Sequence, residues 1–196
     1  MILYTEPKWK SYIITSAGPL FSPEECNRII KIGHSIPPKV AEVGLDKKGS
    51  GVNVKKRTTT ISWIPFEMKE AGEMYHRVNS FIKKANGNHF GFDEVHITEN
   101  AQFTEYPMGG FYEWHMDSDV HMEKEPPVRK MSMTVLLNNP SEFEGGDLEI
   151  MGPGKSPKLT QGQAIVFASF LNHRVTPITR GIRQSLVMWF GGNPLR

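Results

Sequence analysis

The apolar residues between positions 71 and 85 recur every three or four positions, as they do on one face of a helix. These apolar positions are Ala71, Met74, Tyr75, Val78, Phe81, Ile82 and Ala85. Asn86-Gly87 follows the stripe and is typical of a helix end. The pattern therefore predicts a helix whose apolar face packs on the core and backs a sheet.

An earlier helix is indicated by its start signal rather than by a stripe. Ser22 can act as the N-cap, Pro23 suits the first helical position, and Glu25 can close a capping box with Ser22. We expect this helix to run to about Ile32 and to be ended by Gly33.

From about residue 95 the pattern changes to short strand-like runs separated by Gly and Pro turns. The predicted strands cover residues 95–106, 111–117, 129–138, 146–151, 163–168, 172–178 and 182–191, with an earlier one at 58–64. Many short strands after two helices predict a mostly β fold with flanking helices, in which the N-terminal helices pack on one sheet of a sandwich or barrel. No linker divides the chain, so residues 1–196 are predicted to form one domain, with 1–94 as helical and loop support and 95–191 as the β core.

Residues 44–57 show neither the helical nor the strand period of apolar residues. They are rich in glycine and basic residues, which predicts a mobile loop. A loop beside the β core could close over a peptide, and a solvated loop without a role is the alternative.

Composition narrows the class of protein. The net charge is only +2 over 196 residues, which is too small to indicate a nucleic-acid partner. Cys26 is the only cysteine, so no intrachain disulfide can form, which fits a reducing compartment. No signal-like or membrane-spanning apolar run is present. We expect a soluble, cytoplasmic protein that binds neither nucleic acid nor membrane, and these features carry no signal for oligomeric state.

His115-Met116-Asp117 is the first candidate for chemistry. In a strand, residues two apart share a face, so the imidazole and the carboxylate point the same way. His173, in another predicted strand, can complete a set of two histidines and one carboxylate, which holds ferrous iron and leaves positions open. A surface histidine beside a solvated acid is the alternative, because a lone His-x-Asp arises often by chance. His121 could replace His115, although its acidic loop offers no rigid placement.

Arg183 lies ten residues after His173, in the apolar strand that ends at Phe190. A buried arginine is costly unless it is paired. A guanidinium close to an iron site is suited to holding the carboxylate of an organic ligand. An internal Asp or Glu is the alternative partner.

Other residues could line the same site. Tyr106 shares a strand face with Gln102 and Thr104, which suggests a polar cavity wall, or else a solvated sheet face. Trp189 shares the strand face of Arg183 and could wall the pocket; Ser185, also on that face, could donate to the same carboxylate, although ordinary packing is the alternative for both. Arg129 begins a strand near the proposed site and could contact substrate, or could be a structural ion-pair residue.

These residues stand in longer blocks, which are Tyr106 to Asp117, Val128-Arg129, Leu137-Asn138, Phe143 to Ile150 and His173 to Arg183. In these blocks the chain resembles the Fe(II)- and 2-oxoglutarate-dependent dioxygenases, within them the prolyl 4-hydroxylase-like branch, and most of all the small PKHD-type hydroxylases. The resemblance covers roughly residues 95–191, and more loosely the helices and the Arg57-Thr58 strand.

The resemblance implies a double-stranded β-helix, the jelly-roll or cupin-like core. It implies His115, Asp117 and His173 as iron ligands, Arg183 on the C5 carboxylate of 2-oxoglutarate, and Tyr106 and Trp189 lining that subsite. It also implies O2 as a cosubstrate, with ascorbate as a candidate reductant. In one respect the chain departs from the branch: Asp147-Leu148 follows the paired glycines, so a threonine contact to 2-oxoglutarate is missing.

Four functions are open from the sequence. We favour a peptidyl hydroxylase acting on proline, and a hydroxylase of a free amino acid or small metabolite is the second hypothesis. A nucleic-acid demethylase would share the iron ligands, but the nearly balanced charge and the lack of a basic stripe argue against it. A non-catalytic β-barrel that binds metal or a sugar is the fourth, and the complete triad with Arg183 argues against that.

Overall fold

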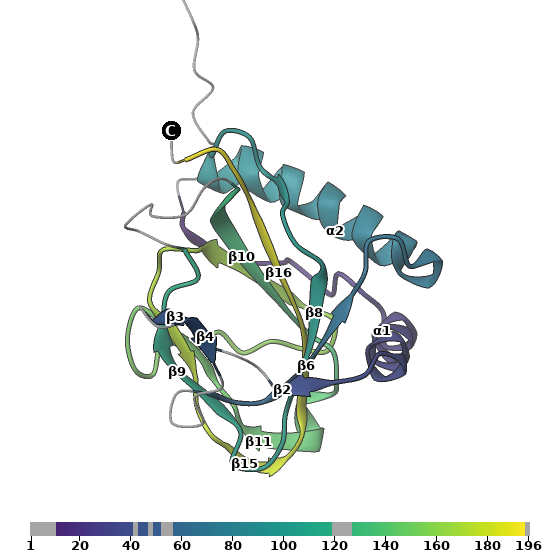
Figure 1. Ribbon diagram of the computed structural model, residues 1–196. Helices are drawn as coiled ribbons and strands as arrows, with labels where there is room; N and C mark the ends of the chain where they lie inside the picture. Colours follow the sequence, from purple (N-terminus) through teal and green to yellow (C-terminus); the bar gives the residue numbers. More distant parts are fainter. Residues whose placement is uncertain (1–10, 41–42, 47–48, 52–56, 119–126, 195–196) are drawn as a thin grey trace, which may run out of the picture.

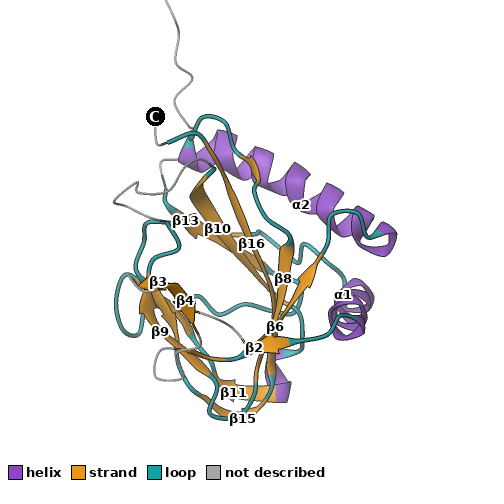
Figure 2. Ribbon diagram, viewed as in Figure 1, coloured by secondary structure: helices purple, strands orange, loops and turns teal. Residues whose placement is uncertain are grey.

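The computed structural model describes residues 11–40, 43–46, 49–51, 57–118 and 127–194, and its elements are shown in Figures 1 and 2. The helices are α1 (Pro23–Ser35), α2 (Gly72–Ala85), the 3-10 turns η1 (Lys69–Ala71) and η3 (Pro140–Glu142), and the π-helical turn η2 (Asn86–Phe90). The strands are β1 (Ile13–Thr15), β2 (Lys39–Val40), β3 (Val43–Asp46), β4 (Gly49–Gly51), β5 (Arg57–Thr58), β6 (Thr60–Ile64), β7 (His96–Ile97), β8 (Ala101–Tyr106), β9 (Phe111–His115), β10 (Val128–Leu136), β11 (Phe143–Gly145), β12 (Leu148–Ile150), β13 (Ala164–Ala168), β14 (His173–Val175), β15 (Ile178–Gly181) and β16 (Arg183–Gly192).

Two antiparallel sheets form the centre of the molecule. The major sheet has the strand order β1-β13-β10-β16-β8-β6-β2, with β7 also paired to β16. The minor sheet has the order β12-β14-β9-β5. The remaining strands form two separate two-stranded sheets, β11-β15 and β3-β4. A mostly β protein with flanking helices, as the sequence predicts, is confirmed.

The alternation of side chains gives the major sheet two different faces. Along β10, Met131, Met133 and Val135 belong to the core cluster under the helices, whereas Ser132 and Thr134 line a cavity on the opposite face. The neighbouring strands β8, β13 and β16 alternate in the same way. The outer face is therefore an apolar bed for the helices, and the inner face is free to carry chemistry.

A second, smaller core closes one end of the space between the sheets. Its buried members are Tyr106, Leu148, Ile150, Ile165, Phe167, Val175 and Ile178, which come from both sheets and from β15. Figure 1 shows α2 crossing the outer side of the major sheet, with α1 beside β6. Helices on one face only leave the other face to the minor sheet.

Helix α1 begins as the sequence predicts but ends later. Ser22 accepts a hydrogen bond from the Glu25 backbone N–H, and the Glu25 carboxylate accepts one from the Ser22 N–H, so the capping box is confirmed. The prediction that Gly33 ends the helix is wrong, because the helix continues to Ser35. A Cβ on Gly33 would lie 2.3 Å from the ring of Phe103 on β8. Gly33 thus allows helix and sheet to approach closely.

Helix α2 confirms the predicted stripe. Met74, Tyr75, Val78 and Ile82 are buried in the core against the major sheet. The α-helix ends at Ala85 as expected, although the backbone stays helical through η2 and turns at Gly91, whose φ is +69°. No helix in the described part of the chain is both long enough and apolar enough to cross a membrane.

Most predicted strands are confirmed with small shifts, but three are divided: 95–106 into β7 and β8, 58–64 into β5 and β6, and 172–178 into β14 and the start of β15. The predicted loop at 44–57 is partly wrong. Residues 43–46 and 49–51 pair as β3 and β4, and Arg57 belongs to β5. Three glycines in this stretch remove the side chains that would have shown a period of two. Residues 47–48 and 52–56, and His121, lie outside the described residues, and the mobility of the loop stays a prediction.

We predict that Gly33→Ala lowers the free energy of unfolding by about 1–3 kcal/mol, because the added methyl must displace the Phe103 ring. Gly72→Ala is the matched control, since a Cβ at this helical position meets nothing within 4 Å. The control should be neutral or stabilise by up to about 1 kcal/mol. Urea unfolding of both variants measures the difference, and equal effects would contradict the close-approach role of Gly33.

Candidate iron and 2-oxoglutarate site

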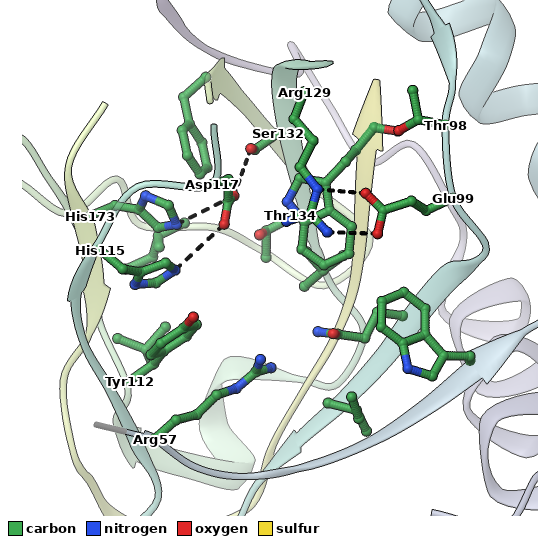
Figure 3. Close-up of a pocket in the computed structure, with 18 of the residues that line it drawn as sticks. Arg57, Thr98, Glu99, Tyr112, His115, Asp117, Arg129, Ser132, Thr134 and His173 are labelled. Atoms are coloured by element: carbon green, nitrogen blue, oxygen red, sulfur yellow. Dashed lines mark hydrogen bonds and ion pairs between the residues drawn. The ribbon is translucent and has the colours of Figure 1, made fainter. Parts of the chain in front are cut away.

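A cavity of about 750 Å³ opens between the two sheets. Figure 3 shows side chains from both walls pointing into it. Its lining includes Arg57, Tyr112, His115 and His173 from the minor sheet, Gln102, Tyr106, Arg129, Ser132, Thr134 and Trp189 from the major sheet, and Asp117 just after β9. The volume is within the roughly 300–1,000 Å³ range of pockets that hold small organic ligands.

Strand pairing brings the two histidines together. His173 on β14 is the direct partner of His115 on β9 in the antiparallel register, although 58 positions separate them along the chain. Asp117 follows β9 and faces both rings: its Oδ1 lies 3.6 Å from His115 Nε2, and its Oδ2 lies 3.6 Å from His173 Nε2. One ligand atom from each residue fits within 4.8 Å of the others. The predicted triad is thus brought together.

Each histidine is held by a backbone carbonyl two residues before it, within β9 for His115 and just before β14 for His173. His115 Nδ1 is 2.8 Å from the carbonyl of Glu113, and His173 Nδ1 is 3.0 Å from the carbonyl of Leu171. A carbonyl only accepts, so Nδ1 must carry the proton and donate in both rings. In the neutral tautomer, Nε2 then keeps its lone pair and faces Asp117, as metal binding requires.

The carboxylate has its own supports. Ser132 on β10 donates to Asp117 Oδ2 at 2.6 Å, and the Ser132 and Ser169 hydroxyls are 2.9 Å apart. The Asp117 backbone N–H donates to the Ser169 carbonyl at 3.0 Å. Burial alone would raise the pKa of Asp117, but the nearby His173 and His115 hold that pKa well below its ordinary value.

Burial also settles the charge of His173. Its side chain is buried, and its ring packs against Phe167 with the centroids 4.6 Å apart. Burial lowers the pKa of His173 to about 4, although the neighbouring Asp117 opposes this. The ring is therefore neutral at pH 7. Two imidazoles and one carboxylate that converge on one point fit ferrous iron.

Arg183 is buried as expected, with 4% of its surface exposed. It stands opposite Tyr106 in the β16-β8 register, its guanidinium carbon 5.8 Å from the Tyr106 ring centroid. Its Nη1 donates to Ser185 Oγ at 3.2 Å. Burial lowers the pKa of Arg183, while Tyr106 and Asp147 oppose this. In the described part of the chain no carboxylate forms an ion pair with it, so the alternative of an internal partner is not found there.

The paired glycines after β11 make room for this arginine. Gly146 has a φ of +66°, and a Cβ there would lie 2.9 Å from Arg183 Cδ and 2.3 Å from Ile178 Cδ1. Any other residue would press on the arginine stem, so the glycine allows the position of Arg183.

Tyr106 on β8 and Trp189 on β16 both line the cavity, and each packs against a different arginine. Tyr106 lies beside Arg183 in the smaller core, which fits its predicted place near the cosubstrate. Trp189 lies under Arg129, whose guanidinium carbon is 4.0 Å from its ring centroid. Arg129 makes a two-pronged contact with Glu99, at 2.5 and 2.6 Å. Arg129 thus has the ion-pair partner that the sequence left open and still lines the cavity, so its substrate contact stays a prediction.

Among the wall residues that the sequence did not predict are Arg57, Tyr112 and Ser132. The ring of Tyr112 stacks on that of His115, with centroids 3.5 Å apart. Ser132 could have been found from the alternation Met131-Ser132-Met133-Thr134, which puts small polar groups on one face. The burial of Arg57 is not predicted from the sequence, because Arg57 falls at the end of the loop expected at 44–57.

We predict that Ser132→Ala weakens binding of Fe(II) or Mn(II) by about 10- to 100-fold, because Asp117 loses the bond that orients it. Ser80→Ala, on the exposed side of α2, is the control and should bind metal as the unchanged protein does. Calorimetric titration without O2 gives the dissociation constants. An unaltered constant for Ser132→Ala would show that Asp117 is held by other means.

Comparison with known proteins agrees with this geometry. Residues 101–191 match the model of the 2OG-Fe(II) oxygenase superfamily. A PKHD-type hydroxylase of Acidovorax ebreus is 36% identical over 93 residues, covering 45% of this chain and 41% of that protein. A PKHD-type hydroxylase of Teredinibacter turnerae is 28% identical over 152 residues, covering 74% of this chain and 66% of that protein. The matched part thus spans about two fifths to two thirds of these relatives.

Solved structures share the fold. A prolyl-4-hydroxylase from Pseudomonas putida superposes with a TM-score of 0.67 at 19% identity, covering 92% of each chain. A prolyl hydroxylase from Trichoplax adhaerens, in complex with a hypoxia inducible factor peptide fragment, gives 0.66 at 20% identity, covering 92% of this chain and 83% of that one. The expected double-stranded β-helix is confirmed by these likenesses. With residues 101–191 matched to the family model and the His115, Asp117 and His173 side chains converging, the chain is similar to the 2OG-Fe(II) oxygenase superfamily.

Proposed function

We propose that this protein is an Fe(II)- and 2-oxoglutarate-dependent dioxygenase that hydroxylates a peptidyl residue, namely proline. The observation that carries the proposal is the convergence of His115, Asp117 and His173 on one cavity. Buried Arg183 packs against Tyr106 of the cavity wall and has no carboxylate partner in the described chain. The triad fits iron, and Arg183 fits the far carboxylate of the cosubstrate. Tyr106 and Trp189 would line that subsite.

Bound iron, with 2-oxoglutarate and O2, would supply the oxidising power for C–H hydroxylation, and ascorbate is a candidate reductant. The protein's own part is orientation. The Nδ1 bonds to backbone carbonyls keep both imidazole Nε2 atoms aimed at one point, and Ser132 keeps the carboxylate turned toward them.

Arg183 would fix the direction of the cosubstrate. Its guanidinium sits in a dry place, with Ser185 fully buried beside it. An electrostatic contact is strong there because little water screens it. The Ser185 hydroxyl accepts from Arg183 and keeps its own proton to donate, which supports its predicted contact with the same carboxylate.

The names of the relatives support a peptide substrate. The solved structures with the same fold include prolyl hydroxylases, one of them bound to a peptide fragment. Hydroxylation of a free amino acid or small metabolite is the second candidate, since the cavity could hold either. The balanced charge still argues against a nucleic acid. A cytoplasmic location stays a prediction from the sequence.

Mass spectrometry of a proline-containing peptide library after turnover tests the substrate class. The enzyme is incubated with Fe(II), 2-oxoglutarate, ascorbate and O2, and free L-proline serves as the parallel sample. A gain of one oxygen atom on peptides, and not on the free amino acid, is expected. Oxidation of free proline alone would favour the second candidate.

We predict that His115→Ala, Asp117→Ala and His173→Ala each abolish conversion of 2-oxoglutarate to succinate, because each loses one ligand of three. Circular dichroism should show an intact fold. His76→Ala, on an exposed position of α2, is the control and should keep full activity. Near-normal turnover in any triad variant, with iron present, would show that the ligand assignment is wrong.

We predict that Arg183→Ala weakens 2-oxoglutarate binding by roughly 30-fold to several thousand-fold. Loss of one partner of a buried charge pair costs about 2–5 kcal/mol, at about 1.4 kcal/mol per decade. Iron affinity should change far less, and Arg183→Lys should keep part of the affinity, since the charge survives without the two-pronged geometry.

The measurement for Arg183 is the 2-oxoglutarate dissociation constant under anaerobic Fe(II), from the visible charge-transfer band. Arg180→Ala, on an exposed side chain of β15, is the control. An unchanged constant in Arg183→Ala would refute its role on the cosubstrate and weaken the dioxygenase proposal itself.

A further inference from the structure

Arg57 is a buried arginine that lines the cavity, and the chemistry proposed above does not use it. It lies on β5, opposite Tyr112 in the β5-β9 register, and only 7% of its surface is exposed. Its guanidinium carbon is 4.6 Å from the Tyr112 ring centroid. Figure 3 shows Arg57 reaching into the cavity beside Tyr112, on the wall that carries the two histidines.

The cavity holds no countercharge for this arginine among the residues that the structure describes. Two carboxylates line the cavity: Glu99 is taken by Arg129, and Asp117 faces the histidines. Lys39 adds a third cation to the lining, so the wall has a surplus of positive charge. A ligand that brings negative charge would restore the balance.

The hydrogen bonds of Arg57 also leave room for a ligand. Arg57 Nε is fully buried and has no hydrogen-bond partner. The Tyr112 side chain offers the guanidinium of Arg57 the face of its ring, 4.6 Å from the guanidinium carbon, and no carboxylate. A buried donor without a partner costs about 1–3 kcal/mol, and more when the group is charged. The guanidinium that contains this donor reaches into the cavity (Figure 3), where a bound ligand would supply a partner.

We propose that Arg57 binds a carboxylate of the substrate that is hydroxylated, and that this enzyme therefore selects substrates with a carboxylate close to the reacting carbon. The proposal rests on the proposed oxygenase function. Arg183 and Arg57 stand on opposite sheets, so the cosubstrate and the substrate would each have an arginine of their own. The carboxylate can come from a free or C-terminal amino acid, or from an acidic side chain next to the hydroxylated residue.

Binding without turnover tests the proposal directly. The protein is loaded with Mn(II) and saturated with 2-oxoglutarate in the absence of O2, so that Arg183 is occupied. The probes are matched pairs of N-acetyl amino acids and their amides, built on proline, alanine, phenylalanine and lysine. Calorimetry gives the affinity of each member. The acid of at least one pair should bind about ten-fold or more tightly than its amide, because a charge-assisted hydrogen bond is lost in the amide.

Variants then test whether Arg57 causes the preference for acids over amides. Arg57→Gln should bind acid and amide about equally, Arg57→Lys should keep part of the preference, and the exposed control Arg180→Gln should keep all of it. The 2-oxoglutarate constant of Arg57→Gln should stay within about three-fold of the unchanged protein. If Arg57→Gln does not fold, the proposal is tested by two other results. The unchanged protein must prefer acids to amides, and Arg57→Lys must show a smaller preference.

Three results would overturn the proposal: no preference for acids in any pair, a preference that survives in Arg57→Gln, or a loss of 2-oxoglutarate binding in Arg57→Gln like that expected for Arg183→Ala. The last would make Arg57 a cosubstrate residue.

Turnover separates the two sources of the carboxylate. Short peptides ending in proline are compared as acid and amide, and peptides with an interior proline are compared with glutamate or glutamine beside it. Faster hydroxylation of one charged member identifies the source. A preference for acids in binding, together with no hydroxylation of any proline peptide, would refute proline as the substrate and leave the role of Arg57 standing.

Discussion

The antiparallel pairing of β9 with β14 is the contact on which the site depends. It sets His115 directly opposite His173, and the turn after β9 then carries Asp117 between their Nε2 atoms. Neither histidine is close to the other in the sequence, so the ligand set exists only when the minor sheet has formed. A slip of one residue in this register would turn one imidazole to the other face of the sheet. The rest of the β core can be understood as the frame that fixes this register.

The major sheet meets a second constraint, because it must be apolar on one face and polar on the other. Its outer face packs on α1 and α2 through residues such as Met131, Met133 and Leu186. On the opposite face of the same strands, Ser132 lines the cavity and Ser185 bonds to Arg183. Strand alternation makes this division possible with no change of backbone. The helices thus have an indirect role in chemistry: they bury one face of the sheet, which leaves the other free to be polar.

Local patterns in the sequence predicted both helices, most of the core strands, the capping box, the His-Asp-His triad and the burial of Arg183, because periodicity and caps act over a few residues. Contacts that depend on tertiary approach were missed. Gly33 was interpreted as a helix end, since nothing near it in the sequence reveals the Phe103 ring. Ser132 supports Asp117 from a strand fifteen positions away. Arg57 follows a glycine-rich basic stretch, and its burial depends on Tyr112, which is brought to it only by the β5-β9 pair.

The bonds from each histidine Nδ1 to the carbonyl two residues before it have a thermodynamic consequence. The rings are oriented by nearby backbone carbonyls and the carboxylate by Ser132, so bonds of the protein itself fix the directions of the three ligand groups. Little conformational entropy is then lost when a metal binds, in contrast with small metal-dependent domains that fold only around their ion. The metal centre is therefore a preorganised receptor, in which loss of the ion would empty the site and leave the architecture standing.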